Sequence, residues 1–257
     1  MSEEQLSAAP ADCVLVMAHP DDEALWASAV LQQARRIVLC FGDVPGQESL
    51  SAGRRAAMAD WPLSGVEHLA LPESGAFASA GWPLPKDTEA GVAVRRGAEA
   101  YAANFQRLLA ALRERLRDAA SVVTHNPWGE YGHEEHIQVF AAVAALQEEL
   151  GFTVYVTGYC SNQTVLLMQR HLARLGPPTP PLPTDTERAV QLRDHYRRHG
   201  CWTWAADYQW PAYECFYPLR PEMAARAKPR GASVSAMNFI WLDAPLRVHL
   251  SLDPFAS

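Results

Sequence analysis

Short apolar runs alternate with amphipathic segments along the first 160 residues of the chain. The runs are almost uniformly hydrophobic, which is typical of short strands buried on both faces of a parallel sheet. They lie at residues 13–18, 37–41, 121–124 and 153–157, and a further strand, which contains Glu67 and His68, is expected at 66–71. Strands that alternate with helices form right-handed βαβ units. The pattern therefore predicts an α/β fold with a mainly parallel twisted sheet flanked by helices.

Helical periodicity fills the intervals between these runs. Apolar residues recur three and four positions apart from Tyr101 to Leu116, which predicts a long amphipathic helix. Further helices are expected at residues 21–35, 51–60 and 133–150. Residues 72–97 are rich in Gly, Ala, Pro and Ser without a clear period, so we expect a surface loop there.

The last third of the chain is less regular. Residues 176–183 are proline-dense and predict an extended connector, and a charged helix is expected at 185–199. Aromatic residues crowd 201–217; aromatic faces bind sugar rings, but so dense a group usually forms a local core. We predict a single domain over residues 1–257, in which 12–160 carry the chemistry and 176–257 shape the substrate site.

Composition narrows the class of protein. Of the 257 residues, 49% are apolar, which suffices for a sizeable core. The net charge is −7 and no basic run is present, so a nucleic-acid partner is not expected. The five cysteines include no CxxC pair and favour reduced thiols in a cytoplasmic protein. We find no signal peptide and no apolar run long enough for a transmembrane segment. The pattern leaves the oligomeric state open.

Three carboxylates follow the first predicted strand, in residues 18–23 (AHPDDE). One interpretation is helix capping, because an acidic side chain near a helix N-terminus accepts hydrogen bonds from free backbone N–H groups. Capping needs only one carboxylate, however, and neighbouring carboxylates repel one another. A nearby cation would explain all three.

Two histidines offer further ligands for such a cation. His133 and His136 lie three residues apart, which places them on one face of a helix, although a solvated helix face also explains such a pair. They follow the fourth predicted strand, and ligands collect at the carboxyl ends of parallel strands. His19, Asp22 and one of these histidines would supply three N/O ligands with a position left for water, as in catalytic zinc sites. A structural site would need a fourth protein ligand, and none is found near the motifs.

This ligand set suits hydrolysis. Zinc lowers the pKa of bound water to about 7 and polarises a carbonyl oxygen. Asp21 is adjacent to a ligand and free to accept the proton of that water. His133, if protonated, would stabilise an oxyanion or protonate a departing nitrogen. Another divalent ion such as Fe²⁺ also fits two histidines and an aspartate.

Together the two motifs resemble those of the LmbE-like/PIG-L deacetylases. AHPDDE after the first strand matches the first motif of that family, and residues 124–136 (THNPWGEYGHEEH) resemble the second over its whole length. The resemblance covers roughly residues 12–160. It implies a Rossmann-like fold and a zinc-dependent hydrolase that removes an N-acetyl group from an amino sugar or glycoside. Some members cleave other amides, such as thiol-conjugate amides.

The resemblance also assigns roles to single residues. His19, Asp22 and His136 match the metal ligands, and Asp21 matches the general base. Zn²⁺ is the implied cofactor, and the implied partner is a small N-acylated molecule.

Other positions of the two motifs match supporting groups. His133 matches the histidine that acts on the oxyanion or leaving group, and Tyr131 matches a tyrosine that helps to polarise the carbonyl. Glu135 stands where an acidic residue, usually Asp, orients that histidine. Glu23 is expected to brace the first motif behind the metal ligands.

Four more residues are candidate substrate contacts. The family tends to show Arg and then Glu three residues on in the helix after the second strand, and here Arg54 is present without that Glu. Arg54 either meets the substrate or is a solvated surface residue. His125 and Asn126 either contact substrate or close a turn, and Trp128 either stacks on a sugar or anchors its loop.

Other histidines, among them His195 and His199, show no partner pattern and are read as surface or packing residues. The function we expect is removal of an N-acyl group from an amino sugar by attack of zinc-bound water. One alternative is an amidase for a larger or thiol-conjugate amide, which a broad or apolar acyl pocket would favour. The other is a non-catalytic metabolite-binding protein of the same fold, against which the intact Asp21 argues.

Overall fold

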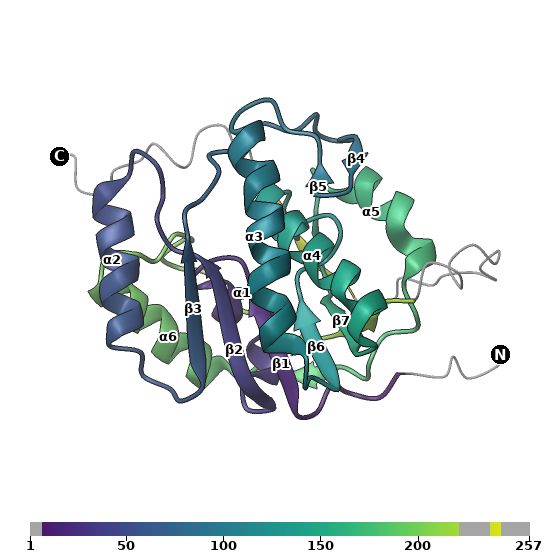
Figure 1. Ribbon diagram of the computed structural model, residues 1–257. Helices are drawn as coiled ribbons and strands as arrows, with labels where there is room; N and C mark the ends of the chain where they lie inside the picture. Colours follow the sequence, from purple (N-terminus) through teal and green to yellow (C-terminus); the bar gives the residue numbers. More distant parts are fainter. Residues whose placement is uncertain (1–6, 221–236, 243–257) are drawn as a thin grey trace.

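A six-stranded sheet forms the centre of the molecule, in the strand order β11-β7-β6-β1-β2-β3 (Figure 1). The computed structural model describes residues 7–220 and 237–242. Five strands pair in parallel, and β11 pairs antiparallel to β7 at one edge. This confirms the predicted α/β class. The strands are β1 (Cys13–Met17), β2 (Ala34–Phe41), β3 (Val66–Leu71), β6 (Ser121–Thr124), β7 (Thr153–Thr157) and β11 (Phe216–Pro218).

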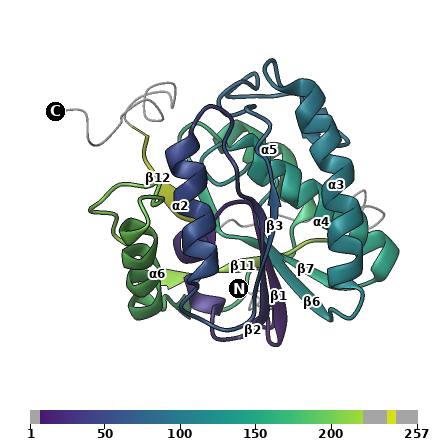
Figure 2. The same ribbon diagram turned by 60° about the vertical axis from the view of Figure 1, so that its left-hand side comes forward.

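Helices cover both faces of this sheet (Figure 2). On one face, α3 (Ala98–Leu116) and α4 (Glu134–Leu150) bury an apolar stripe against alternate strand residues such as Val14 and Val16. On the other face, α1 (Asp22–Trp26), α2 (Glu48–Ala59) and α6 (Thr186–Arg198) pack on the residues between, such as Leu15. Side chains of a strand point alternately to its two faces, so both must be apolar here, which explains the uniform runs in the sequence.

The remaining elements are short. They are a 3₁₀ turn η1 (Ser28–Val30), the hairpin β4 (Asp87–Thr88) and β5 (Gly91–Val92), α5 (Val165–His171) with the 3₁₀ turn η2 (Leu172–Arg174), the pair β9 (Leu182–Pro183) and β10 (Tyr213–Glu214), and the pair β8 (Tyr159–Ser161) and β12 (Asn238–Ile240).

The helix expected over residues 21–35 is much shorter in the structure. It stops at Trp26, because Ala27 has a φ of −147°, outside the helical range. The chain then forms only the 3₁₀ turn η1, where the buried carboxylate of Glu214 accepts the Ala29 N–H. A partner almost two hundred residues away therefore ends a segment that local pattern alone would continue.

The C-terminal part of the chain reaches the carboxyl-end edge of the sheet. Residues 201–210 run across α1, where the Trp210 indole donates to the Ala24 carbonyl and Thr203 bonds to Asp21. The rest of the predicted C-terminal part, at 221–236 and 243–257, lies outside the described residues. All five cysteines are buried and free of disulfides. Within the described ranges, no helix combines the length and the apolar character needed to cross a bilayer.

Candidate active site

The two sequence motifs meet at the carboxyl ends of β1 and β6. These strands are direct neighbours, with Val16 opposite Thr124, so the loops that follow them begin side by side. His19 follows β1 and His136 lies in the first turn of α4. Both are almost completely buried. The adjacency predicted from the strand pattern is therefore present in the fold.

Three residues with potential ligand atoms form a tight triangle there. The His19 Nδ1 lies 3.1 Å from an Asp22 carboxylate oxygen and 3.3 Å from the His136 Nε2, which in turn lies 3.3 Å from the other Asp22 oxygen. Ligand atoms bound to zinc at 2.0–2.1 Å in tetrahedral geometry are about 3.3 Å apart. The distances between the two histidine nitrogens, and from each of them to one of the two Asp22 oxygens, match that value.

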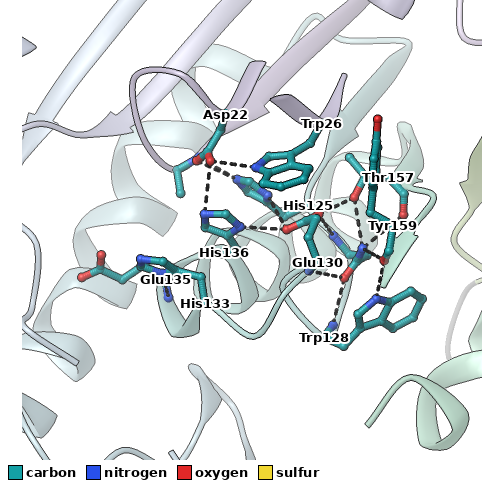
Figure 3. A network of polar contacts seen from close by, with 12 residues as sticks. Asp22, Trp26, His125, Trp128, Glu130, His133, Glu135, His136, Thr157 and Tyr159 are labelled. Atoms are coloured by element: carbon teal, nitrogen blue, oxygen red, sulfur yellow. Dashed lines mark hydrogen bonds and ion pairs between the residues drawn. The ribbon is translucent and has the colours of Figure 1, made fainter. Parts of the chain in front are cut away.

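His136 is oriented by a carboxylate behind it (Figure 3). Its Nδ1 lies 2.7 Å from Glu130, so that Nδ1–H donates and the Nε2 lone pair faces Asp22. The same Glu130 oxygen lies 3.0 Å from the Nδ1 of His125, whose Nε2 accepts the Ala18 N–H. The two imidazole rings stack at 3.9 Å. A carboxylate on the far nitrogen is the usual support of a metal-binding histidine.

His19 has the corresponding support on its own far side. Its Nε2 lies 3.1 Å from Glu135 and 3.5 Å from Glu73. Glu135 also accepts hydrogen bonds from the Ser74 backbone N–H and hydroxyl. The carboxylate expected to orient His133 thus contacts His19 instead, because the side chain of Glu135 points across the first turn of α4 toward β1.

The charge balance of this cluster favours a cation. Burial lowers the pKa of His19, but the carboxylates of Glu73, Asp22 and Glu135 outweigh it and raise that pKa to about 10. Burial likewise opposes the charge on His136, while Asp22 and Glu130 raise its pKa to about 9. These carboxylates need a positive partner at the triangle of ligand atoms, which a proton or a metal ion can provide.

Asp21 is held next to the triangle by a residue from the C-terminal part. One of its oxygens accepts hydrogen bonds from the Thr203 backbone N–H at 3.0 Å and hydroxyl at 2.7 Å. Its φ of 108° is rare for a residue with a side chain and indicates a constrained backbone. Burial and the neighbouring Asp22 raise the pKa of Asp21 to about 6. A carboxyl with that pKa can both accept and release a proton near neutrality.

Glu23 stabilises the turn that carries Asp21. It accepts a hydrogen bond from the Asp21 backbone N–H at 3.2 Å and another from the Tyr196 hydroxyl at 2.8 Å. Burial raises its pKa to about 8. Glu23 therefore links the first motif to α6 through Tyr196.

His133 caps the N-terminus of α4. Its Nδ1 accepts the Glu135 N–H at 3.2 Å, which leaves the proton of the neutral ring on Nε2. Burial and the neighbouring His19 and His136 hold the pKa of His133 well below its usual value. The condition that His133 be protonated is therefore not met in this geometry, and the neutral ring acts as a hydrogen-bond donor.

Aromatic side chains surround His133. The rings of Phe77 and Tyr131 lie 4.6 Å and 6.0 Å from it, and Trp204 packs on Tyr131 at 4.8 Å. Burial and the carboxylates of Asp22 and Asp21 raise the pKa of Tyr131 well above its usual value, so that its hydroxyl stays protonated.

Three of the predicted substrate contacts lie inside the protein. His125, Asn126 and Trp128 are completely buried. The Asn126 amide nitrogen donates to Thr157 and Tyr159, and its oxygen accepts the N–H groups of Trp128 and Glu130. The Trp128 indole donates to the Tyr159 carbonyl. These side chains shape the second motif from within, because their polar atoms are already bonded.

Arg54 is neither solvated nor open to the surface. It is 3% exposed and forms an ion pair with Glu73 at 2.5 Å. Glu73 also lies near His19. It thus supplies, from a loop after β3, the acidic partner that the sequence lacks three residues after Arg54.

Sequence reasoning missed Glu130, Glu73 and Thr203. Glu130 lies in the quoted motif, but its left-handed backbone, with a φ of 52°, breaks any helical spacing to His136. Glu73 and Thr203 are distant from both motifs in the chain and carry no local signal. Only Glu130 had a signal in the sequence: it is an acidic residue close to His136, and metal-binding histidines usually donate their other ring N–H to such an acceptor.

The sequence matches no family model and no curated protein sequence. Solved structures do match the fold. A teicoplanin deacetylase in a zinc-inhibited form is 14% identical, with a TM-score of 0.51 over 80% of this chain and 97% of that chain. A deacetylase of the A40926 pseudoaglycone is 16% identical, with a TM-score of 0.50 over 82% of this chain and 98% of that one.

This is the fold of the LmbE-like/PIG-L deacetylases. At such low identity the likeness concerns the fold alone. It spans nearly the whole length of both deacetylases, so the deacetylase fold of this chain includes the C-terminal elements that sequence reasoning could not match.

Proposed function

We propose that the protein is a metal-dependent hydrolase that removes an N-acetyl group from an amino sugar. The single observation that carries the proposal is the triangle formed by His19, Asp22 and His136, with a carboxylate behind each histidine. The shared fold adds weight, because the matching structures are named as deacetylases of teicoplanin and of the antimicrobial A40926 pseudoaglycone.

His19, Asp22 and His136 would hold the ion in this proposal. Zn²⁺ or another divalent ion bound there supplies Lewis acidity, which lowers the pKa of water and polarises a carbonyl. Glu130 and Glu135 keep the donor nitrogens of the two histidines turned toward the ion. Three protein ligands would leave the coordination of such an ion open to water and substrate.

Asp21 would act as the general base. Thr203 fixes the carboxylate through one oxygen and leaves the other without a bond to that residue. Its pKa near 6 suits a group that takes a proton from water and passes it to the leaving amine. The constrained backbone at Asp21 keeps this side chain apart from the ligand Asp22 that follows it.

His133 and Tyr131 would stabilise the negative charge that develops on the carbonyl oxygen. Both are neutral hydrogen-bond donors in a buried environment, where such bonds are stronger than in water. Phe77 and Trp204 line the same side and offer apolar faces to the acyl group or to a sugar ring.

The test is acetate release from a panel of N-acetylated amino sugars and their glycosides. The protein is assayed as purified, after chelation, and after Zn²⁺ or Fe²⁺ is restored. We expect release that disappears with the chelator and returns with the ion. Protein that contains the metal but releases acetate from no member of the panel, while hydrolysing longer N-acyl or thiol-conjugate amides, would favour the amidase instead.

A further inference from the structure

A second group of potential metal ligands lies at the junction of α2 and α6. It consists of Asp60, which follows α2, and of His195 and His199, one helical turn apart at the end of α6. Their ligand atoms lie within 4.8 Å of one another, and the His199 Nε2 is 3.5 Å from the Asp60 carboxylate. We propose that these three residues bind a divalent cation such as Zn²⁺ at a site separate from the proposed catalytic one. We call this site the α2–α6 metal site.

The tautomer of His195 supports this assignment. Its Nε2–H donates to the Ala57 carbonyl at 2.9 Å, so the lone pair is on Nδ1. Histidines that bind metals usually donate their other ring N–H in this way, to a carbonyl or carboxylate. His195 is 1% exposed and its ring is also held by Trp61 at 6.1 Å, so this ligand is already fixed in place.

The other two ligands can close on an ion at little cost. The ring of His199 lies 4.8 Å from that of His195, and Asp60 is exposed and free to change rotamer. Histidines at positions i and i+4 of a helix share one face. Both α2 and α6 also end here, and the carbonyl groups at helix C-termini attract a positive charge.

One positive group competes for the site. The guanidinium of Arg198 lies 3.3 Å from the His195 Nδ1, where the ion would bind. Arg198 is exposed, so it can turn into solvent when an ion replaces it at this nitrogen. Its neighbour Arg197 is equally exposed and carries the same charge, but its bonds do not include this nitrogen.

The site would also fasten α6 to α2. Tyr196, next to His195, donates its hydroxyl to Glu23 behind the first motif. An ion bound by both helices would hold that tyrosine in place. We therefore expect zinc to raise the melting temperature through this site as well as through the catalytic one.

Equilibrium dialysis of the full-length, metal-free protein against micromolar Zn²⁺, followed by total metal analysis, tests the proposal. We expect two ions in the wild type and one in His199→Ala and in Asp60→Asn. Asp60 is exposed and His199 is half-buried, so neither change removes a side chain of the core. Asp22→Ala should lose the catalytic ion and keep the other. Binding at the α2–α6 metal site should weaken at least about tenfold when a ligand is removed.

Substitution of Arg198 or of its neighbour Arg197 tests the location of the site more directly. Arg198→Ala should tighten zinc binding at the α2–α6 metal site, whereas Arg197→Ala, the matched control, should change it less. A wild type whose only ion is lost in Asp22→Ala would overturn the proposal, and so would a second ion retained by both His199→Ala and Asp60→Asn. Because these readouts are metal content and affinity, they are independent of any failure to find a substrate.

Discussion

Glu130 offers the most direct perturbation of the proposed metal site without touching a ligand. One of its oxygens accepts from both His125 and His136, and the other accepts from the Asn126 N–H and the Thr157 hydroxyl. All four partners donate. Burial raises the pKa of Glu130, but the two histidines outweigh it and lower that pKa to about 2, so the carboxylate is charged.

Glu130→Gln keeps the shape and replaces one acceptor by an amide donor. Whichever way the amide turns, its NH₂ group meets two donors. If it faces the histidines, the Nδ1–H of His136 loses its acceptor and the ring is free to turn its Nε2 away from Asp22. Loss of such a supporting carboxylate costs about 10–100-fold in metal affinity. Buried donors left without partners cost about 2 kcal/mol of folding stability.

Glu134→Gln is the matched control. Glu134 is also fully buried, and its carboxylate also accepts several donors: the N–H groups of residues 78–80 and the Trp82 indole. None of these belongs to a metal-site histidine. We expect both variants to unfold at lower urea concentration, but only Glu130→Gln to bind Zn²⁺ more weakly in competition with a chromophoric chelator. Equal zinc affinity in the two variants would refute the reasoning.

Three further predictions follow from the site and its surroundings. His136→Ala should lose the catalytic metal, whereas Asp21→Ala should keep it and lose most turnover; metal content measured beside acetate release separates them, and near-normal turnover of Asp21→Ala would remove it as the base. Thr203→Val deletes a hydrogen bond to the Asp21 carboxylate that is worth about 1.5 kcal/mol, so the pKa of that base should rise. The acid limb of the kcat/KM profile should then move up by about one pH unit, and a limb that does not move would contradict this. Burial raises the pKa of Glu214 from 4.5 to about 7, so the folded state holds a proton that the unfolded state releases, and stability falls as pH rises from 4.5 to 7. Glu214→Gln should remove that component, about 3 kcal/mol by pH 8, and urea unfolding at pH 5 and pH 8 should then differ less than in the wild type.

Most of the central sheet could be predicted because its inner strands β1, β6 and β7 are buried on both faces. The runs at Val66–Leu71, Ser121–Thr124 and Thr153–Thr157 have the bounds that the hydrophobic pattern gave. β11 could not be found in this way, since three residues ending in proline carry too little pattern. It forms because β7 presents a free edge, which is a property of the assembled sheet and not of the local sequence.

Some residues of the candidate site could likewise be predicted from the sequence, and others could not. Residues close in sequence, such as His133 at the N-cap of α4 and His136 in its first turn, can be predicted from their spacing. Residues that act through the fold cannot: Glu73 comes from the loop after β3, and Thr203 from a loop after α6. For His125 and Asn126 the sequence left two interpretations open, because it cannot tell a polar side chain that faces a cavity from one whose bonds are all internal.

Each of the three carboxylates in AHPDDE has a different surrounding in the structure. A single cation was expected to explain all three, yet each has its own partner. Asp22 faces the two histidines, Asp21 is held by Thr203, and Glu23 is held by Tyr196. Because two of these partners lie after residue 185, the C-terminal part does more than shape a substrate site. It fixes the orientation of the proposed base, while the first half of the chain supplies the proposed metal ligands.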